Sequence, residues 1–505
     1  MLETLVHVVF GLASAILTVY AALEVRMLLG FWRTRKATAD SGGAAYGVGS
    51  MADAPTVTVQ IPIYNEGMAV LPLLKAVAGF DYPRDRLDIQ VLDDSTDATS
   101  GIVCAKITRL RAQGLRISHV RRESRAGWKA GALDEGLRVS DAEFVAVFDA
   151  DFVPPADYLR RALIDNSAFR NPDVAFVQGR WSYTNWDQNV LTRTQAILLD
   201  RHFTIQKPYI KEKDGTTVFN GSGGVLRRAA IDAVGGWSAD TLCEDLDLSY
   251  RFALNGWTGV YDADLASPSE IPNTLAAFKL QQRRWAKGSA QCMRKLTADI
   301  LQSTSLRDRS DDLFVMFGYI IHPVLLIYSL LWPMVVLSSS APTLLSIGQT
   351  ALMFANVVAV AGFAATAVES RRSFTIASAR DVFVAMQLGM SLMVNNTVAF
   401  LDGCIRRSGE FQRTPKMQNA AMPRRSFGAH WSVVLELAYT AYMLGAASIL
   451  YRAGYAMPAI PCVALGGVMA FFFLYQFIPP RRRDAPVSLN EPATRLPSPA
   501  PAESA

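Results

Sequence analysis

The sequence has few cysteines, and their positions form no recognisable pattern. The five cysteines (Cys104, Cys243, Cys292, Cys404 and Cys462) stand far apart without paired spacing. Cysteine pairs a few residues apart are typical of structural zinc sites, and dense even sets are typical of secreted disulfide frameworks. The sequence therefore indicates neither kind of site, and it fits a soluble part that folds in a reducing cytosol.

Two further patterns are missing. No Gly-x-Gly-x-x-Gly follows the first predicted strand, 56–63, which disfavours a dinucleotide site. The net charge of +5 is modest and comes from arginine clusters beside apolar segments. Such clusters are typical of membrane-flanking segments, so we expect no nucleic-acid partner.

Charge is scarce in the last third of the chain, where long apolar segments lie. Together with 4–30 near the N-terminus, they predict five membrane spans, since each approaches or exceeds the ~20 residues that cross a bilayer. The four later segments are 313–338, 343–368, 431–452 and 456–478. A further stretch, 381–402, is interrupted by polar residues, and the positive-inside rule places it at the inner interface. We therefore expect an integral protein of a plasma or bacterial inner membrane, with its N-terminus outside.

The predicted domains follow from these segments. The first is an N-terminal membrane helix with its basic flank, and the second is a Gly/Ala/Ser-rich linker. A cytoplasmic domain comes next, then a membrane region that includes an interfacial helix and a loop at about 381–422, and finally a disordered cytoplasmic tail. Their boundaries are 1–36, 37–55, 56–300, 301–479 and 480–505.

The cytoplasmic segment alternates short apolar runs with amphipathic stretches. This alternation predicts an α/β domain with a mostly parallel sheet flanked by helices. Strands are expected at 56–63, 87–92, 116–120, 144–148 and 174–178, and helices at 68–78, 98–112, 128–139 and 156–167.

The strand at 144–148 runs straight into two carboxylates, Asp149 and Asp151. Residues two apart on an extended chain point the same way, so both oxygens can face one site at the carboxyl edge of the sheet. Hard oxygen ligands of this kind suit Mg²⁺ or Mn²⁺, and such an ion neutralises a diphosphate. The alternative is a surface turn with two solvated aspartates.

Acidic residues also end the two preceding strands and begin a later helix. Glu66 follows the first strand and Asp94 the second, where a carboxylate can accept hydrogen bonds from a nucleotide; an Asx-type turn is the alternative for Asp94. Glu244 and Asp245 are candidates for a general base, although acids in a first helical turn are also ordinary partners of the helix dipole. Lys129, near a predicted helix start, is placed to contact a phosphate or a base carbonyl.

An amphipathic stretch from about 274 to 296 precedes the first C-terminal membrane segment and carries Gln281, Arg284 and Trp285. Tryptophan with basic residues at this place is typical of a membrane-interface anchor. The other interpretation gives Trp285 a sugar face to stack on and Arg284 a diphosphate to pair with.

Taken together and in this order, these motifs resemble those of the membrane-embedded family 2 glycosyltransferases, which are inverting enzymes of GT-A fold. The amino-acid sequences of the segments 60–66, 90–97 and 410–416 are similar to those of cellulose synthase and of the cellulose-synthase-like mannan and glucan synthases. The resemblance extends over roughly residues 55–300.

The resemblance implies a role for each residue. Asp94, Lys129, Asp149 and Glu66 would bind the nucleotide, Asp149 and Asp151 the metal, and Gln281, Arg284 and Trp285 the acceptor and the diphosphate. Asp245 would be the general base, supported by Glu244. Phe411, Thr414 and Lys416 match a gating-loop motif of cellulose synthases, but Arg413 stands where that motif has valine.

The predicted function is processive, inverting synthesis of a β-linked glucan or mannan, with transfer of the polymer across the membrane. The expected partners are a nucleotide sugar (UDP-glucose or GDP-mannose), the growing glycan, membrane lipid and export proteins. The first alternative is a non-processive enzyme that adds one sugar to a lipid. The second, from another class, is a transporter or scaffold whose cytoplasmic domain only senses a nucleotide.

Overall fold

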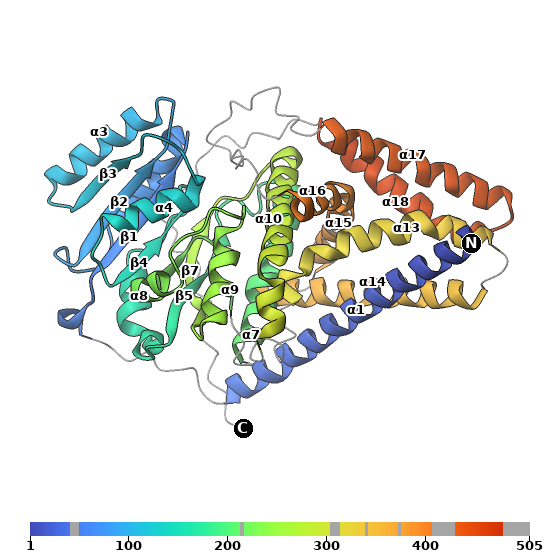
Figure 1. Cartoon of the computed structure of the whole chain (residues 1–505), viewed down its shortest axis with the longest axis horizontal. Helices are drawn as coiled ribbons and strands as arrows, with labels where there is room; N and C mark the ends of the chain where they lie inside the picture. The colour runs from blue at the N-terminus through green and yellow to red at the C-terminus, as the bar shows by residue number, and fades with distance from the viewer. Residues whose placement is uncertain are drawn as a thin grey trace.

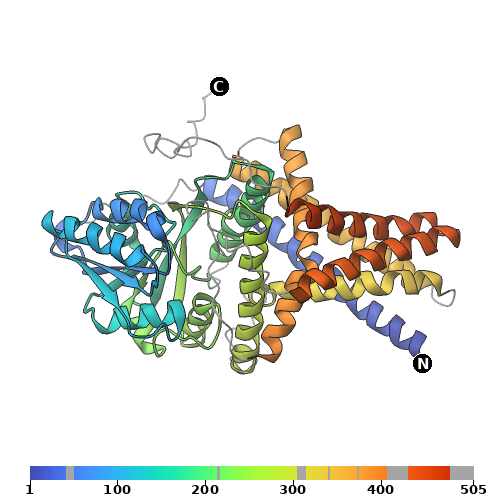
Figure 2. The same cartoon turned by 90° about the horizontal axis from the view of Figure 1, so that it is seen from above.

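The computed structural model describes residues 1–40, 50–212, 217–303, 314–338, 342–371, 375–406 and 430–477. Within these ranges the chain forms an α/β domain at one end and a group of long apolar helices at the other (Figures 1 and 2). The gating-like residues Phe411, Thr414 and Lys416 and the predicted tail from 480 lie outside the described residues.

A seven-stranded sheet forms the centre of the α/β domain, in the order β3-β2-β1-β4-β6-β5-β7. All five predicted strands are present, and β6 and β7 are additional. Parallel pairing joins β1 to β2, β1 to β4, β2 to β3 and β5 to β7, whereas β6 is antiparallel to both of its neighbours. The strands are β1 Val57–Ile63, β2 Leu87–Asp93, β3 Ile117–Arg121, β4 Phe144–Val147, β5 Val174–Tyr183, β6 Gly224–Arg227 and β7 Thr258–Ser269.

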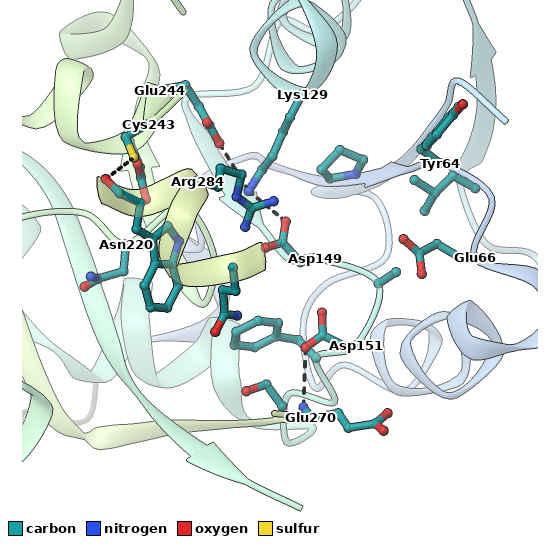
Figure 3. Close-up of a pocket in the computed structure, with 18 of the residues that line it drawn as sticks. Tyr64, Glu66, Lys129, Asp149, Asp151, Asn220, Cys243, Glu244, Glu270 and Arg284 are labelled. Atoms are coloured by element: carbon teal, nitrogen blue, oxygen red, sulfur yellow. Dashed lines mark hydrogen bonds and ion pairs between the residues drawn. The ribbon is translucent and has the colours of Figure 1, made fainter. Parts of the chain in front are cut away.

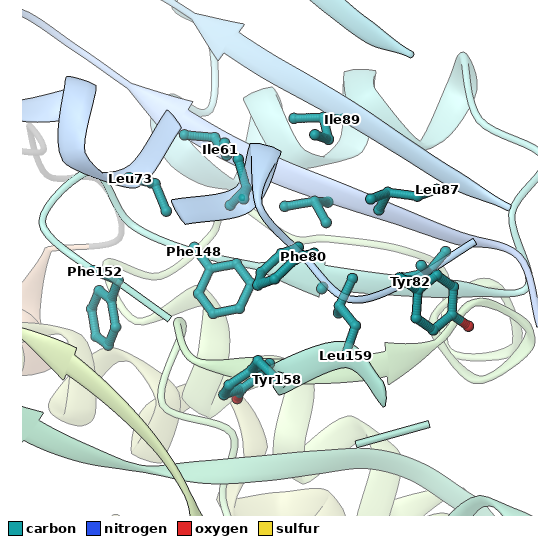
Figure 4. Packing of buried hydrophobic residues seen from close by; sticks show 14 of the residues in the cluster. Ile61, Leu73, Phe80, Tyr82, Leu87, Ile89, Phe148, Phe152, Tyr158 and Leu159 are labelled. Atoms are coloured by element: carbon teal, nitrogen blue, oxygen red, sulfur yellow. The ribbon is translucent and has the colours of Figure 1, made fainter. Parts of the chain in front are cut away.

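Both faces of the sheet are buried, which explains why its central strands read as unbroken apolar runs. On β4, Ala146 belongs to the core cluster on one face, while Val145 and Val147 belong to the cluster on the other. Phe148, just after β4, packs with Phe80 and Tyr158 in the first cluster (Figure 4). The strand is thus fixed from both sides immediately before the two aspartates.

Helices cover the sheet largely where the periodicity predicts them. The predicted helix 156–167 is instead one α-helical turn followed by a π-helical turn. The helices of this domain are η2 Gly67–Val70, α2 Leu71–Ala78, α3 Thr99–Ala112, α4 Trp128–Arg138, α5 Tyr158–Arg160, η3 Arg161–Asp165, η4 Ser167–Arg170, α8 Arg228–Ala233 and α9 Glu244–Leu254.

Five helices in the described residues are long and apolar enough to cross a membrane, as predicted. They are α1 Leu2–Asp40, α13 Ile321–Leu337 with η6 Gly318–Ile320, α14 Pro342–Arg371, α17 His430–Arg452 and α18 Ala456–Tyr475. The ambiguous stretch forms α15 Ile376–Ser391 and α16 Met393–Ile405, which meet at a 44° bend. Although α1 is first in the chain, its Phe10 stacks on Tyr328 of α13, so both ends of the sequence share one helical core.

Two segments connect the sheet to these helices. The amphipathic stretch forms α10 Leu275–Gln302, which lies between the sheet and the membrane helices (Figures 1 and 2). It begins after Thr274, whose hydroxyl accepts from the N–H of Ala277 at 3.3 Å. The second segment leads from β5 towards β6 and consists of α6 Val190–Asp200, the π-helix η5 Arg201–Gln206 and α7 Lys207–Glu212.

Candidate active site

The described site candidates all line one pocket at the carboxyl edge of the central strands. Glu66 follows β1, Asp94 follows β2, and Asp149 and Asp151 follow β4. The remaining candidates come from three helices: Lys129 from α4, Glu244 and Asp245 from α9, and Gln281, Arg284 and Trp285 from α10. The residues that follow strands lie together because parallel strands end at the same edge of the sheet. The residues on helices reach the pocket because the fold of the whole domain packs those helices beside that edge.

The two aspartates after β4 are held by the backbone around them. The N–H of Asp149 donates to the Ser222 hydroxyl at 2.9 Å, and Asp151 Oδ2 lies 3.4 Å from the N–H of Glu270. In the part of the chain that the structure describes, no three His, Cys, Asp or Glu side chains come close enough to hold a metal ion by themselves. Mg²⁺ commonly takes one or two carboxylates and completes its shell with substrate phosphates and water. The pair therefore fits an ion that binds together with a diphosphate.

Lys129 lies between Asp149 and Glu244 (Figure 3). Its Nζ is 2.7 Å from Asp149 Oδ1 and 3.4 Å from Glu244 Oε1, and it donates to the carbonyl of Gly221 at 2.9 Å. Burial alone would lower the pKa of Lys129, but the two carboxylates outweigh it and hold the pKa above its ordinary value. The lysine is therefore charged, and it joins the strand acids to the helix acids.

Gly221 permits this close arrangement. Its φ is +77°, and a Cβ built there would lie 2.9 Å from Asp245 Oδ2 and 3.3 Å from Lys129 Nζ. A side chain at this position would push into the acidic cluster while also straining the backbone. The small-residue turn at 219–224 thus brings main chain against the candidate base.

Glu244 and Asp245 occupy the first turn of α9, where the helix dipole favours negative charge. Burial and the neighbouring Glu244 nevertheless raise the pKa of Asp245 to about 7, although the charge of Lys129 opposes both. A carboxyl that titrates near neutrality can take up and release a proton at physiological pH. The dipole interaction alone therefore does not describe this pair.

The adjacent acids Asp93 and Asp94 occupy different environments. Asp93 accepts from Ser95, Ser100 and His119, and although burial opposes its ionisation, these bonds hold its pKa well below the usual range. Asp94 lines the pocket and pairs with Arg122 through two contacts of 3.0 and 2.5 Å. Asp93 is therefore held by residues of the fold, whereas Asp94 is the acid of the two that lines the pocket.

Several pocket residues were not singled out from the sequence. The Arg125 guanidinium lies 3.4 Å from the centre of the Tyr64 ring, and both residues line the pocket. Figure 3 shows Tyr64 on the same side of the pocket as Glu66. Trp181, Asn220 and Glu270 line other parts of it. Arg125 opens a basic, glycine-containing segment, Asn220 stands in the small-residue turn at 219–224, and Glu270 follows β7, so these three had a local signal, whereas Trp181 had none.

The α10 residues share one helical face, since they are three and four positions apart. The helix is held close to the start of α9: a Cβ on Gly288 would lie 2.3 Å from the Cys243 sulfur. Only glycine allows this approach, and it fixes Gln281, Arg284 and Trp285 over the acidic cluster.

Part of the chain is similar in sequence to known proteins. Residues 144–368 match a family model described as "Glycosyl transferase family group 2". "Glucomannan 4-beta-mannosyltransferase 2" of Arabidopsis thaliana is 43% identical over 257 residues, covering 50% of this chain and 48% of that protein. "Glucomannan 4-beta-mannosyltransferase 1" of Oryza sativa subsp. japonica is 42% identical over 253 residues, covering 49% and 48%.

Among solved structures, the mannosyltransferase PcManGT from Pyrobaculum calidifontis, in complex with GDP-Man and Mn²⁺, has a TM-score of 0.49 at 21% identity, covering 78% of this chain and 99% of that one. The chain spans about half the length of the curated relatives that it matches. The matched residues contain the two aspartates, the α9 acids and the α10 triad. Residues 144–368 are therefore similar to the family 2 glycosyltransferases, and the α/β domain lies in the sequence between helices long and apolar enough to cross a membrane.

Proposed function

We propose that the chain is a membrane-embedded hexosyltransferase that builds a β-linked mannan-type polysaccharide from a nucleotide sugar, by an inverting and processive reaction. One observation carries the proposal. A single pocket combines the two acids after β4, the α9 acids and the α10 face, and Lys129 pairs with both Asp149 and Glu244. The relatives are named as mannosyltransferases, which favours mannosyl transfer and hence GDP-mannose before UDP-glucose as the donor.

In the proposed reaction, Asp245 takes the proton of the acceptor hydroxyl as that oxygen attacks the anomeric carbon of the donor sugar. The new C–O bond forms on the face opposite the diphosphate, whose bond to the sugar breaks, so the configuration inverts. A pKa near neutrality suits Asp245 to this role, and Glu244 supports it by keeping that pKa raised. Arg284 offsets charge on the leaving diphosphate. Asp149 and Asp151 would hold Mg²⁺ or Mn²⁺, which supplies further positive charge at the diphosphate.

The position of α10 supports processivity. The face with Gln281 and Trp285 lines the pocket, while Lys279 forms a 2.7 Å ion pair with Glu436 of α17. Gln282 accepts from Tyr319 next to α13, and Asn395 of α16 donates to the carbonyl of Lys279. Polar contacts thus continue from the pocket to the apolar helices, as a product passing between them would require.

Donor turnover by the purified full chain in liposomes tests the function. GDP-mannose and UDP-glucose, each with Mg²⁺ or Mn²⁺, are supplied separately, and product size is read before and after mannanase or cellulase. A long mannanase-sensitive polymer made only with GDP-mannose and abolished by a chelator is expected. A single sugar on lipid would contradict processivity, and no turnover of any donor would contradict the enzyme itself.

We also propose that the α/β domain is cytoplasmic and the N-terminus external. Cys104 on α3 is exposed, so it offers a native reporter for the α/β domain. A membrane-impermeant maleimide should label Cys104 only after cells are permeabilised, whereas a Glu3→Cys variant in a Cys104→Ser background should react in intact cells. The opposite pattern would reverse the orientation.

A further inference from the structure

The turn that leads into α4 has an unusual backbone conformation. Gly127 has a φ of +70°, and Trp128, the residue before Lys129, has a φ of +47°. Glycine adopts such values freely, whereas a bulky side chain makes them sterically costly. Strained residues of this kind persist only where the surrounding structure holds them, and they cluster at functional sites. Contacts from outside the turn must therefore hold Trp128 in place.

Arg122 supplies these contacts. Its Nη2 donates to the carbonyl of Trp128 at 3.0 Å, and its Nη1 donates to the carbonyl of Ala126 at 2.7 Å. The two bonds fix the main chain on both sides of Gly127. A planar guanidinium suits this task because its donors point in fixed, divergent directions.

The same guanidinium also pairs with Asp94. Its Nε lies 3.0 Å from Asp94 Oδ1 and its Nη2 lies 2.5 Å from Asp94 Oδ2, and both side chains are largely buried. Such a two-point pair is strong and directional. Since Asp94 lines the pocket, Arg122 links the pocket acid after β2 to the turn before Lys129.

Gly131 makes room for this link. A Cβ built on Gly131 would lie 2.2 Å from the carbonyl oxygen of Ala126 and 2.6 Å from Arg122 Nη1. The N–H of Gly131 donates to the carbonyl of Gly127 at 2.9 Å, which ties the turn to the first turn of α4. The two glycines of this segment thus serve different needs: Gly127 adopts a positive φ, and Gly131 leaves space for the guanidinium.

The position of Lys129 depends on the turn that precedes it. The φ of Trp128 sets the direction in which α4 leaves the turn, and Lys129 is the next residue. Lys129 Nζ reaches Asp149 at 2.7 Å and Glu244 at 3.4 Å. If Trp128 relaxed to a negative φ, the start of α4 would rotate and carry Lys129 away from these carboxylates.

We propose that Arg122 is a positioning residue for the transfer reaction. It holds the strained turn at Trp128, so that Lys129 stands between Asp149 and Glu244, and its pair with Asp94 ties that position to the nucleotide end of the pocket. The inference rests on the proposed function. Arg122 itself does not line the pocket, so it acts through Asp94 and Lys129 and not on the substrate.

Arg122→Lys tests the proposal, because lysine keeps the charge but cannot form the same set of bonds with one rigid group. The purified full chain in liposomes is assayed with GDP-mannose and Mn²⁺ between pH 5 and 9. At the optimum, kcat/KM should fall roughly 10- to 100-fold, since a misplaced group near the reacting atoms is costly.

The pH profile of Arg122→Lys separates positioning from a loss of stability. The charge of Lys129 lowers the pKa of Asp245, so a displaced Lys129 should let that pKa rise. The decline of kcat/KM on the acid side should therefore begin at a pH about one unit higher than in the wild type. A variant that only lost stability would keep the profile of the wild type.

Arg227→Lys is the matched control. Arg227 on β6 also donates to two main-chain carbonyls, those of Val174 at 3.0 Å and Phe169 at 2.8 Å, but it does not line the pocket. Its replacement should lower the Tm, while kcat/KM and the position of the acid decline stay as in the wild type.

The double variant Arg122→Lys/Trp128→Gly supplies a rescue. Glycine adopts a positive φ without support, so the turn should keep its shape when Arg122 no longer holds it. Much of the lost kcat/KM should return, and the acid decline should move back towards its position in the wild type.

Two results would overturn this inference alone, given an active wild type. One is an Arg122→Lys protein whose activity and pH profile match those of Arg227→Lys, and the other is a double variant that recovers no activity. A wild type that turns over no donor would overturn the proposed function and this inference with it.

Discussion

Replacing Asp245 with asparagine should strongly slow transfer and at the same time stabilise the protein. Burial and Glu244 raise the pKa of Asp245 to about 7, so its ionised form is disfavoured in the fold. At about 1.4 kcal/mol per pH unit, the ionised form costs up to about 4 kcal/mol, and solvent screening of this half-buried side chain reduces the figure to about 2 kcal/mol. Asparagine has the same shape and no charge, and it therefore relieves this cost.

The gain should depend on pH in one direction. Below about pH 4 the carboxyl is protonated in both the folded and unfolded states, so asparagine brings little advantage. As the pH rises towards 7, the unfolded chain ionises while the fold resists, and the stability of the wild type falls relative to the variant. Thermal unfolding in detergent, without donor or metal, should show the Tm of Asp245→Asn rising by roughly 2–4 °C at pH 8. Donor turnover should fall about 10²- to 10⁴-fold, the usual contribution of a general base.

Asp247→Asn is the matched control on the same helix. Asp247 is fully buried and pairs with Arg251 at 2.7 Å and Lys295 at 2.8 Å, so its replacement leaves two cations without their partner. Removing one member of such a cluster costs about 3–5 kcal/mol, and the Tm should fall. An Asp245→Asn protein that stays active, or that loses stability as Asp247→Asn does, would refute the reasoning.

Three further predictions follow from the same geometry. The kcat/KM for the donor should decline as the pH falls below about 7, with an apparent pKa that belongs to the Glu244–Asp245 pair, and a pH-independent profile between 5 and 8 would argue against Asp245 as the base. Gly221→Ala should lower the free energy of unfolding by about 1–3 kcal/mol and the activity at least tenfold. Gly235→Ala is the control: Gly235 has a φ of +83°, and no described atom lies within 4 Å of its added Cβ, so this variant should lose stability but not activity. Equal activity losses in the two variants would contradict the steric argument. Lys279→Met should lower the Tm because it leaves Glu436 unpaired. The double variant Lys279→Met/Glu436→Gln should recover most of this loss; a loss in the double variant equal to the sum of the two single-variant losses would contradict the prediction.

Much of the fold could be predicted because its signals are local. A buried parallel strand is a short apolar run, and a membrane helix is a long one, so β1 to β5 and the five long apolar helices were expected at their observed places. Acids at the ends of consecutive parallel strands must meet at one edge of the sheet, and this is why Glu66, Asp94 and Asp149 line one pocket.

The sequence by itself therefore determined which residues have side chains that can act as acids, bases or metal ligands, and which segments are buried. Only the tertiary structure decided how they meet. The antiparallel pairing of β6 with β4 and the 2.9 Å hydrogen bond from Lys129 to Gly221, ninety-two positions away, both join segments that are distant in the sequence. Periodicity reports whether a side chain is buried but not against what, because pairing across the sheet and packing of α10 over it depend on the whole domain at once.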